Sequence, residues 1–264
     1  MNVIIVGCGA MGGAVLSGCL EKGIWKRREV KILSKNEKSS KEKAEKYGVF
    51  YIKDEKEIEE ADVVLIAVKP HIVPSVLDKI SKYGPKHVIS LAAAVTLSDL
   101  SKKLPKETEV VRVMPNTPAS VGAGMTAITC KDNVSEKFLE ETEKIFNALG
   151  ETVVVTEKEL DALGALSGSG PGYAFVIMDA LSDAGVEIGL SRKLATKAAA
   201  LTLYGAGKMA LETKKHPGEL RDEVTSPGGT TIAGIHAMEK AGIRTALKDG
   251  VLAAFQKTKE MSKK

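Results

Sequence analysis

Six residues near the amino terminus have the types and spacing of a loop that binds a dinucleotide. They are Gly7, Cys8, Gly9, Ala10, Met11 and Gly12, and they follow a short apolar run and open a helical pattern. In such a loop Gly7 permits a tight turn, Gly9 lets the backbone approach a pyrophosphate, and Gly12 lets helix and strand pack closely. The helix N-terminus adds amide donors and partial positive charge. A glycine-rich turn that binds nothing is the alternative.

The residues after the second expected strand bear on which dinucleotide is bound. An NAD-specific site has an acidic residue there to hold the ribose 2′-hydroxyl, whereas this chain has Ser34, Lys35 and Asn36. A hydroxyl, an ammonium and an amide suit a 2′-phosphate, which favours NADPH and leaves NADH as the alternative donor. Lys35 as an ordinary surface lysine stays open, and Glu37 lies close enough to weaken the distinction.

A third segment is expected at the same crevice. It consists of Ala67, Val68, Lys69 and Pro70 and ends another apolar run. Ligands of open α/β sheets bind beyond the carboxyl ends of the strands, so we expect Lys69 to face the crevice and bind cofactor ribose or substrate carboxylate. Pro70 is expected in the first turn of the next helix. For Lys69 the alternative is a strand-end lysine in solvent.

A loop with two prolines, residues 112–118, is a candidate wall of the substrate site. Proline fixes φ and restricts the residue before it, so this loop is expected to be rigid. Asn116 lies between the prolines and has an amide that suits nicotinamide or substrate. An asparagine in this position also bonds commonly within its own turn, and both interpretations stay open.

Two more glycine-rich stretches, residues 167–173 and 226–231, each precede an expected helix. The second contains Gly228, Gly229 and Thr230, whose backbone N–H groups lie near a helix N-terminus and form a natural receptor for a small carboxylate. Thr231 adds a hydroxyl beside them. Simple helix capping by Ser or Thr is the structural alternative, although a capped helix needs fewer glycines.

Hydride transfer is the chemistry that these parts favour. The sequence has no metal-ligand cluster and no nucleophile elbow, and none of its four histidines has a partner that the sequence reveals. In hydride transfer the cofactor carries the difficult step and the protein orients the substrate. A C=N acceptor polarises more readily than a ketone, so a neutral Thr hydroxyl suffices where a ketone reductase needs a stronger acid.

Short β-rich runs alternate with helical patterns through the first half of the chain. The expected strands are residues 3–6, 30–33, 62–68, 87–91, 109–113, 125–129 and 152–156. Helices are expected at residues 11–22 and 38–47, each followed by a glycine, Gly23 or Gly48, that ends it. This rhythm predicts βαβ units and a mainly parallel sheet, an α/β domain over residues 1–156.

The second half, residues 157–264, is expected to be all helical. Its helical candidates are residues 171–188, 192–212, 231–240 and 245–261. Some of these stretches, such as residues 194–203, are apolar around most of the helix circumference, which a lone exposed helix does not tolerate. We therefore expect packing against a second copy as a homodimer or higher homo-oligomer. A compact monomer that buries these faces internally is the alternative.

Composition narrows the classes of partner. The 264 residues carry a net charge of only +4 with scattered lysines, so we expect no nucleic-acid or membrane partner. The longest apolar runs fall short of the ~20 residues of a membrane span, and the chain enters its first strand without a basic leader, so we expect a cytoplasmic protein. Cys8, Cys19 and Cys130 are widely spaced among apolar residues, which favours reduced, structural thiols.

The motifs at residues 7–12, 67–70, 112–118, 167–173 and 226–231 resemble, in the same order, those of the pyrroline-5-carboxylate reductase family. The stretch at 226–231 is the more specific, since many dehydrogenases share the glycine loop. The resemblance implies a Rossmann domain, a helical dimerisation domain, and NAD(P)H-dependent reduction of (S)-1-pyrroline-5-carboxylate to L-proline, the last step of proline biosynthesis.

The resemblance also implies roles for individual residues. The amides of Gly229, Thr230 and Thr231 hold the substrate carboxylate, and the Thr231 hydroxyl binds the ring nitrogen and helps to protonate it. Ser226 and Val224 line the pocket.

Two departures from the family pattern stand out. Gly172 replaces the usual Ala before the tyrosine, which loosens a helix start. Lys214 and Lys215 occupy a stretch where some members have an acidic residue near the ring nitrogen, and Glu212 comes slightly earlier. Any acidic contact with the substrate there is in doubt.

Other functions remain as alternatives. β-Hydroxyacid dehydrogenases combine similar halves but carry a catalytic lysine four residues after a comparable glycine, where this chain has Ala174. Another NADPH-dependent imine reductase is a second alternative. A nucleotide-binding regulator without turnover is a third, although it has little reason to keep Thr231 together with the carboxylate receptor.

Overall fold

The chain consists of two compact units. A computed structural model describes residues 1–262. The first unit comprises Met1–Ser169 and the described residues from Ala254 onward, and the second comprises Gly170–Ala253.

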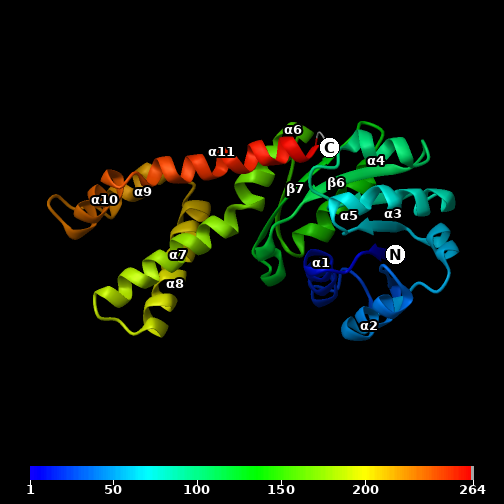
Figure 1. Cartoon of the computed structure of the whole chain (residues 1–264), viewed down its shortest axis with the longest axis horizontal. Helices are drawn as coiled ribbons and strands as arrows, with labels where there is room; N and C mark the ends of the chain where they lie inside the picture. The colour runs from blue at the N-terminus through cyan, green and yellow to red at the C-terminus, as the bar shows by residue number, and fades with distance from the viewer. Residues whose placement is uncertain (263–264) are drawn as a thin grey trace. The chain divides into compact units, whose positions relative to one another are not determined.

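One sheet organises the first unit (Figure 1). Within residues 1–262 it has eight strands, in the order β3-β2-β1-β4-β5-β6-β7-β8. The strands are β1 (Val3–Val6), β2 (Val30–Leu33), β3 (Phe50–Tyr51), β4 (Val63–Ile66), β5 (His87–Ser90), β6 (Glu109–Met114), β7 (Gly124–Cys130) and β8 (Gly150–Val154). All neighbouring pairs are parallel except β6 and β7. The first six strands have the order of a Rossmann fold.

Both faces of the sheet are buried. Successive residues of a strand point to opposite faces, so each strand contributes side chains to two core clusters. In β1, Val3 and Ile5 belong to one core cluster and Ile4 and Val6 to the other. Helices α1 (Ala10–Glu21) and α5 (Glu136–Asn147) supply apolar side chains to the first cluster, and α3 (Val73–Ile80) and α4 (Leu97–Lys103) supply them to the second. Strands that are apolar throughout, such as β1 and β4, are typical of a sheet covered on both faces.

The remaining helices of this unit start and stop at residues of the expected types. Helix α2 (Glu37–Tyr47) begins with Asn36, whose side chain accepts a hydrogen bond from the Ser39 N–H, and ends at Gly48 with φ 64°. Helix α6 (Glu157–Leu163) begins with a capping box and runs into a π-helical turn, η6 (Gly164–Gly168). Both ends of α2 use common helix-capping chemistry.

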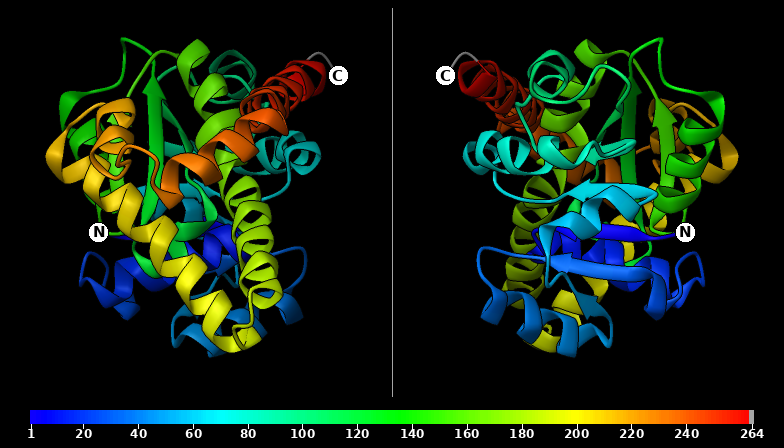
Figure 2. Two further views of the ribbon diagram at one scale, coloured as in Figure 1. Left: turned by 90° about the vertical axis from the view of Figure 1, so that its left-hand side faces the viewer. Right: turned by 90° about the vertical axis from the view of Figure 1, so that its right-hand side faces the viewer.

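The second unit is helical (Figure 2). Its elements are α7 (Gly170–Glu187), α8 (Arg192–Thr213), α9 (Pro217–Glu223), α10 (Thr230–Lys240) and the larger part of α11 (Ile243–Ser262). Helices α7 and α8 form a hairpin (Figure 1), and a Cβ built on Gly185 of α7 would lie 2.8 Å from the Cβ of Ala195 in α8. None of the described helices, in either unit, is long and apolar enough to cross a membrane.

The mainly parallel Rossmann sheet and the helical second half confirm the predicted fold class. Local differences remain: β3 was not predicted, β8 ends at Val154 rather than at residue 156, and α4, α5, α6 and α9 were not among the predicted helices. The helix expected to start at Pro70 begins as a 3₁₀ turn, Pro70–Ile72, and continues as α3. Strand β3 has two residues and pairs only with β2 along the described chain, so its sequence carries no alternation to detect.

Candidate functional site

Three of the predicted segments meet at one cleft of the first unit. The cleft has a volume of about 760 Å³, and the predicted residues along it are Gly7, Gly9, Ser34, Lys35, Ala67, Val68 and Lys69. It lies where β1 has β2 on one side and β4 on the other, so that the strand order reverses. Chain segments that leave the carboxyl ends of neighbouring parallel strands converge at this point, which is where open α/β sheets bind ligands.

The glycine loop is closely packed against the chain that follows β4. Gly7 has φ 87°, and its N–H donates to the Leu33 carbonyl at 2.8 Å. A Cβ on Gly7 would lie 2.5 Å from Val68 Cγ1, and a Cβ on Gly12 would lie 2.4 Å from the Gly7 carbonyl oxygen. Around Gly9, by contrast, no heavy atom of the described residues other than its own chain neighbours lies within 4 Å of such a Cβ. The loop is therefore fixed by Gly7 and Gly12 and open for a ligand at Gly9.

Other residues predicted at this site have different surroundings. Cys8 is buried in the core, and burial raises the pKa of its thiol despite nearby lysines. Ala10 and Met11 start helix α1, and Pro70 is the first residue of the turn η3 (Pro70–Ile72). Cys8, Cys19 and Cys130 are all free thiols, as predicted.

The turn between β2 and α2 brings polar groups to the cleft. Ser34, Lys35, Asn36 and Lys43 all line it. The Ser34 Oγ atom is buried and has no hydrogen-bond partner among the described residues. Buried hydroxyl groups are nearly always bonded, so this hydroxyl is available to an ordered water or to a ligand in the cleft. Glu37 is the nearby acidic residue that weakened the predicted distinction between NADPH and NADH. Its Oε1 lies 3.4 Å from the Tyr51 hydroxyl.

The Asn116 side chain forms hydrogen bonds within the protein. Its Nδ2 donates to the Ser167 carbonyl in η6 at 3.0 Å, and its Oδ1 accepts from the Met125 N–H at 3.0 Å. Asn116 thus links the end of β6, β7 and the π-helical turn rather than only its own turn. One Nδ2 hydrogen stays available for a ligand, because an amide nitrogen has two.

Arg112 in β6 forms a buried ion-pair cluster with α6. Its side chain is 0% exposed, Nη1 lies 3.0 Å from Glu157 Oε1, and Nη2 lies 2.7 Å from Asp161 Oδ1. Glu157 Oε1 also accepts from the Leu97 N–H at 2.7 Å. The sequence placed Arg112 in a motif but did not indicate this role. The cluster holds α6, and with it the turn η6 that Asn116 contacts, on the sheet.

The predicted carboxylate receptor lies in the second unit, at the N-terminus of α10. Gly229 is the residue before the helix, so no side chain caps it within the described structure. Gly228 has φ 67°, and the Gly229 N–H donates to the Ser226 carbonyl at 3.0 Å. The first amides of α10 therefore follow a tight glycine turn. This geometry does not match the alternative in which Ser or Thr caps the helix.

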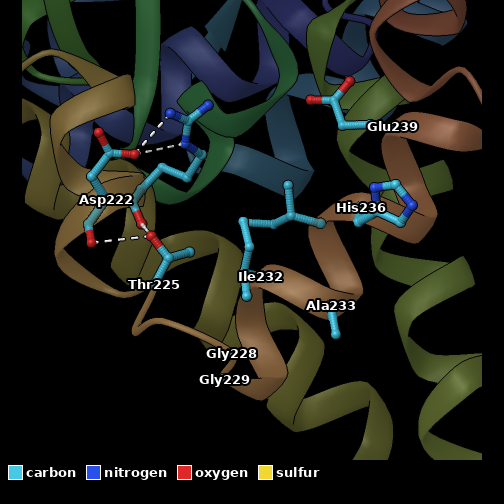
Figure 3. A pocket seen from close by; sticks show the side chains of 10 residues that line it. Asp222, Thr225, Gly228, Gly229, Ile232, Ala233, His236 and Glu239 are labelled. Carbon is cyan, nitrogen blue, oxygen red and sulfur yellow. Dashed lines mark hydrogen bonds and ion pairs between the residues drawn. The ribbon is translucent and has the colours of Figure 1, made fainter.

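A groove of about 610 Å³ adjoins this turn (Figure 3). Gly228 and Gly229 line it, together with α9 residues that include Asp222 and α10 residues that include His236 and Glu239. The predicted residues Val224 and Thr231 are both exposed. Within residues 1–262, no group of three or more His, Cys, Asp or Glu side chains could hold a metal ion.

The stretch that departs from the family pattern is occupied by surface ion pairs. Lys215 contacts Glu223 and lies 3.8 Å from Glu219, and Glu223 raises the pKa of Lys215. Glu212 lies 3.6 Å from Lys208. Lys214 has φ 56° and ends α8.

Comparisons with known proteins agree with this architecture. A pyrroline-5-carboxylate reductase of Methanosarcina acetivorans is 42% identical over 262 residues, 98% of this chain and 97% of that protein. The family model described as pyrroline-5-carboxylate reductase dimerisation matches residues 157–261. This chain belongs to the pyrroline-5-carboxylate reductase family. The resemblance predicted from its motifs is confirmed.

Solved structures of pyrroline-5-carboxylate reductases cover the same length. The enzyme from Coxiella burnetii has a TM-score of 0.90 at 35% identity and covers 100% of this chain and 99% of its own. The Plasmodium falciparum enzyme with NADP bound has a TM-score of 0.89 at 31% identity and covers 99% and 98%. Residues 2–94 also match a model described as NADP oxidoreductase coenzyme F420-dependent. The dimerisation model supports homo-oligomerisation of this chain.

Several residues that line the cleft of the first unit were not among the predicted site residues. Ser39, Ser40 and Lys43 on α2 and Ser75 on α3 line the cleft. Their signal is weak, because serine and lysine are common on any helix surface. A search of the first turns after each expected strand would have found Ser39 and Ser40.

Proposed function

We propose that this protein reduces the C=N bond of (S)-1-pyrroline-5-carboxylate to L-proline, the last step of proline biosynthesis, with NADPH as the preferred donor. Membership of the family supports the reaction, and the Plasmodium falciparum structure with NADP supports the cofactor. The observation that carries the substrate assignment is the N-terminus of α10, which has several amides, a preceding glycine turn and no side-chain cap within the described chain.

The cleft of the first unit fits a dinucleotide with a 2′-phosphate. The open backbone at Gly9 suits a pyrophosphate at the N-terminus of α1. Ser34 supplies a hydroxyl that has no partner among the described residues, and Lys35 supplies a positive charge on the same loop. Lys69 is exposed on the cleft wall, where it suits a ribose hydroxyl or the substrate carboxylate. When bound, the cofactor supplies a hydride for the imine carbon.

The residues of the second unit bind and orient the substrate in this proposal. The amides of Gly229, Thr230 and Thr231 bind its carboxylate, because helix N-terminal amides favour anions. Ser226 and Val224 line the pocket that holds the substrate ring. The Thr231 hydroxyl donates to the ring nitrogen and holds the proton there as that nitrogen gains electron density. Within the first unit, Asn116 fixes its own loop to the π-helical turn and to β7 through its bonds to Ser167 and Met125.

The direct test is oxidation of NADPH and of NADH by the purified protein with pyrroline-5-carboxylate, followed by cofactor absorbance with proline detected independently. We expect turnover to proline with both donors and a higher kcat/KM for NADPH. NADPH binding without any proline formation would overturn the substrate assignment and direct the search to other cyclic imines or to a regulatory role.

Ser34→Asp should shift the cofactor preference toward NADH. The new carboxylate would repel the 2′-phosphate of NADPH and could accept a hydrogen bond from the 2′-hydroxyl of NADH. We expect the ratio of kcat/KM for NADPH to that for NADH to fall about fivefold or more, since close like charges cost on the order of 1 kcal/mol even when partly screened. Steady-state kinetics with both donors measure this ratio. An unchanged ratio would remove Ser34 and Lys35 from the cofactor site.

We also propose that the domain boundary lies at residue 157 and that the helices of the second half pair two copies. Exposed apolar side chains on α8 support the pairing: Leu194 is 52% exposed and Leu201 is 57% exposed, seven residues apart on one face. A cytoplasmic location and the absence of nucleic-acid and membrane partners are part of the same proposal.

Replacing both Leu194 and Leu201 with glutamate should dissociate the assembly. Association of two copies would then remove two carboxylates on each copy from water. We expect light scattering to show a dimer or larger oligomer for the parent and a monomer for L194E/L201E at equal concentration. Lys82→Glu, at an exposed position of the first unit, is the charge-changing control. A double variant that keeps the parent mass would show that the interface lies elsewhere.

A further inference from the structure

Ser40 joins the end of β2 to the first turns of α2 beneath the cofactor cleft. Its side chain is fully buried, with 1% exposure for the residue. The Ser40 Oγ accepts a hydrogen bond from the Ser34 N–H at 2.9 Å and donates one to the Asn36 carbonyl at 3.1 Å. The hydroxyl is thus bonded on both sides, and it acts on the loop rather than directly on a ligand.

These bonds close the 34–36 loop onto its own helix. The Ser40 N–H also donates to the Asn36 carbonyl at 3.0 Å, and Asn36 Oδ1 accepts from the Ser39 N–H at 2.9 Å. Ser34 and Asn36 are therefore fixed relative to the N-terminus of α2. The Ser34 hydroxyl itself has no partner in the described chain, so nothing in the protein competes with a ligand for it.

A hydroxyl that bonds the carbonyl four residues earlier is common on helices and is by itself structural. Ser101 in α4 makes that bond to the Leu97 carbonyl at 2.7 Å. Ser40 differs because its oxygen also accepts from the amide of Ser34, which lies outside the helix, in the loop that follows β2. Without Ser40 that N–H loses its partner, and the loop has to move to satisfy it.

We propose that Ser40 is a positioning residue for cofactor selectivity: it holds the 34–36 loop in the shape that receives a 2′-phosphate. This inference rests on the proposed use of NADPH at Ser34 and Lys35. Because Ser40 shapes only the loop beside the 2′ position, its loss affects NADPH and spares NADH, whose 2′-hydroxyl needs no such receptor.

The test is Ser40→Ala with dissociation constants for NADPH and NADH measured by nicotinamide fluorescence, and with 2′,5′-ADP and 5′-AMP as competing probes. We expect the Kd of NADPH to rise about five- to tenfold, the effect of one lost hydrogen bond, and the Kd of NADH to stay within about twofold. The 2′,5′-ADP probe should weaken in parallel with NADPH. Ser40→Thr keeps the hydroxyl and should restore part of the selectivity, and Ser101→Ala should leave it unchanged.

The outcomes separate this inference from the proposed function. If the parent protein prefers NADPH and Ser40→Ala changes neither affinity, or weakens both donors equally, Ser40 is only structural and the inference fails while the proposed function stands. If the parent protein binds NADH as tightly as it binds NADPH, the proposed preference for NADPH fails, and the inference about Ser40 fails with it. Thermal unfolding of Ser40→Ala shows whether any change in binding follows from lost stability.

Discussion

Replacing Thr231 with valine should lower kcat for pyrroline-5-carboxylate reduction about a hundredfold, while the Kd of NADPH stays unchanged. Donation of a proton to a reacting group contributes roughly 10²–10⁴-fold in enzymes, and a weak acid such as a threonine hydroxyl belongs at the lower end. Valine has nearly the same shape and keeps the backbone N–H that is proposed to bind the carboxylate. The expected loss therefore lies in kcat more than in KM.

Thr231→Ala and Thr231→Ser complete the test. The alanine variant removes the hydroxyl and the methyl group and should lose about as much kcat as the valine variant. The serine variant keeps a hydroxyl and should retain activity within several-fold of the parent. Equal turnover in the valine, alanine and parent proteins would remove Thr231 from the reaction and leave only the amides of α10 as substrate ligands.

Combining Glu157→Gln with Asp161→Asn should destabilise the first unit by about 3–5 kcal/mol. These changes neutralise both partners of Arg112, whose side chain is 0% exposed, and they leave a buried cation without a counter-charge. The two carboxylates are about a quarter to a third exposed, so either single change should cost much less, since the other partner remains. Trp25, the single tryptophan, is 2% exposed and reports unfolding in denaturant by fluorescence.

A third change tests the physical reason for that loss. Adding Arg112→Met to the double variant removes the buried charge itself and should recover most of the lost stability, because an apolar replacement of a buried ion pair is often close to neutral. If the triple variant is no more stable than the double variant, packing of Arg112 against the sheet matters more than its charge. Glu157→Gln alone can still accept the Leu97 N–H, which separates that bond from the ion pair.

Much of this fold could be predicted from local sequence patterns. The apolar runs of β1 and β4 are buried on both faces of the sheet, so their sequence shows strands without needing partners to be known. Asn36 marks the start of α2 and Gly48 marks its end, because an N-cap and a left-handed residue act within one helical turn. By contrast, β3 exists only because Phe50 and Tyr51 lie beside β2. A two-residue edge strand has almost no pattern of its own.

By itself, the sequence determined the glycine loop, the missing acidic residue after β2 and the glycine-rich stretch before α10, because each depends on residues adjacent along the chain. That no side chain caps α10 within the described residues was decided by the structure. Only the tertiary structure decided that Arg112 meets Glu157 and Asp161, separated by 45 and 49 residues, and that Asn116 reaches Ser167, 51 residues away. It also decided that the Ser40 hydroxyl reaches back to the Ser34 amide. Such contacts depend on how strands and helices dock, and docking is set by the burial of whole faces rather than by any local pattern.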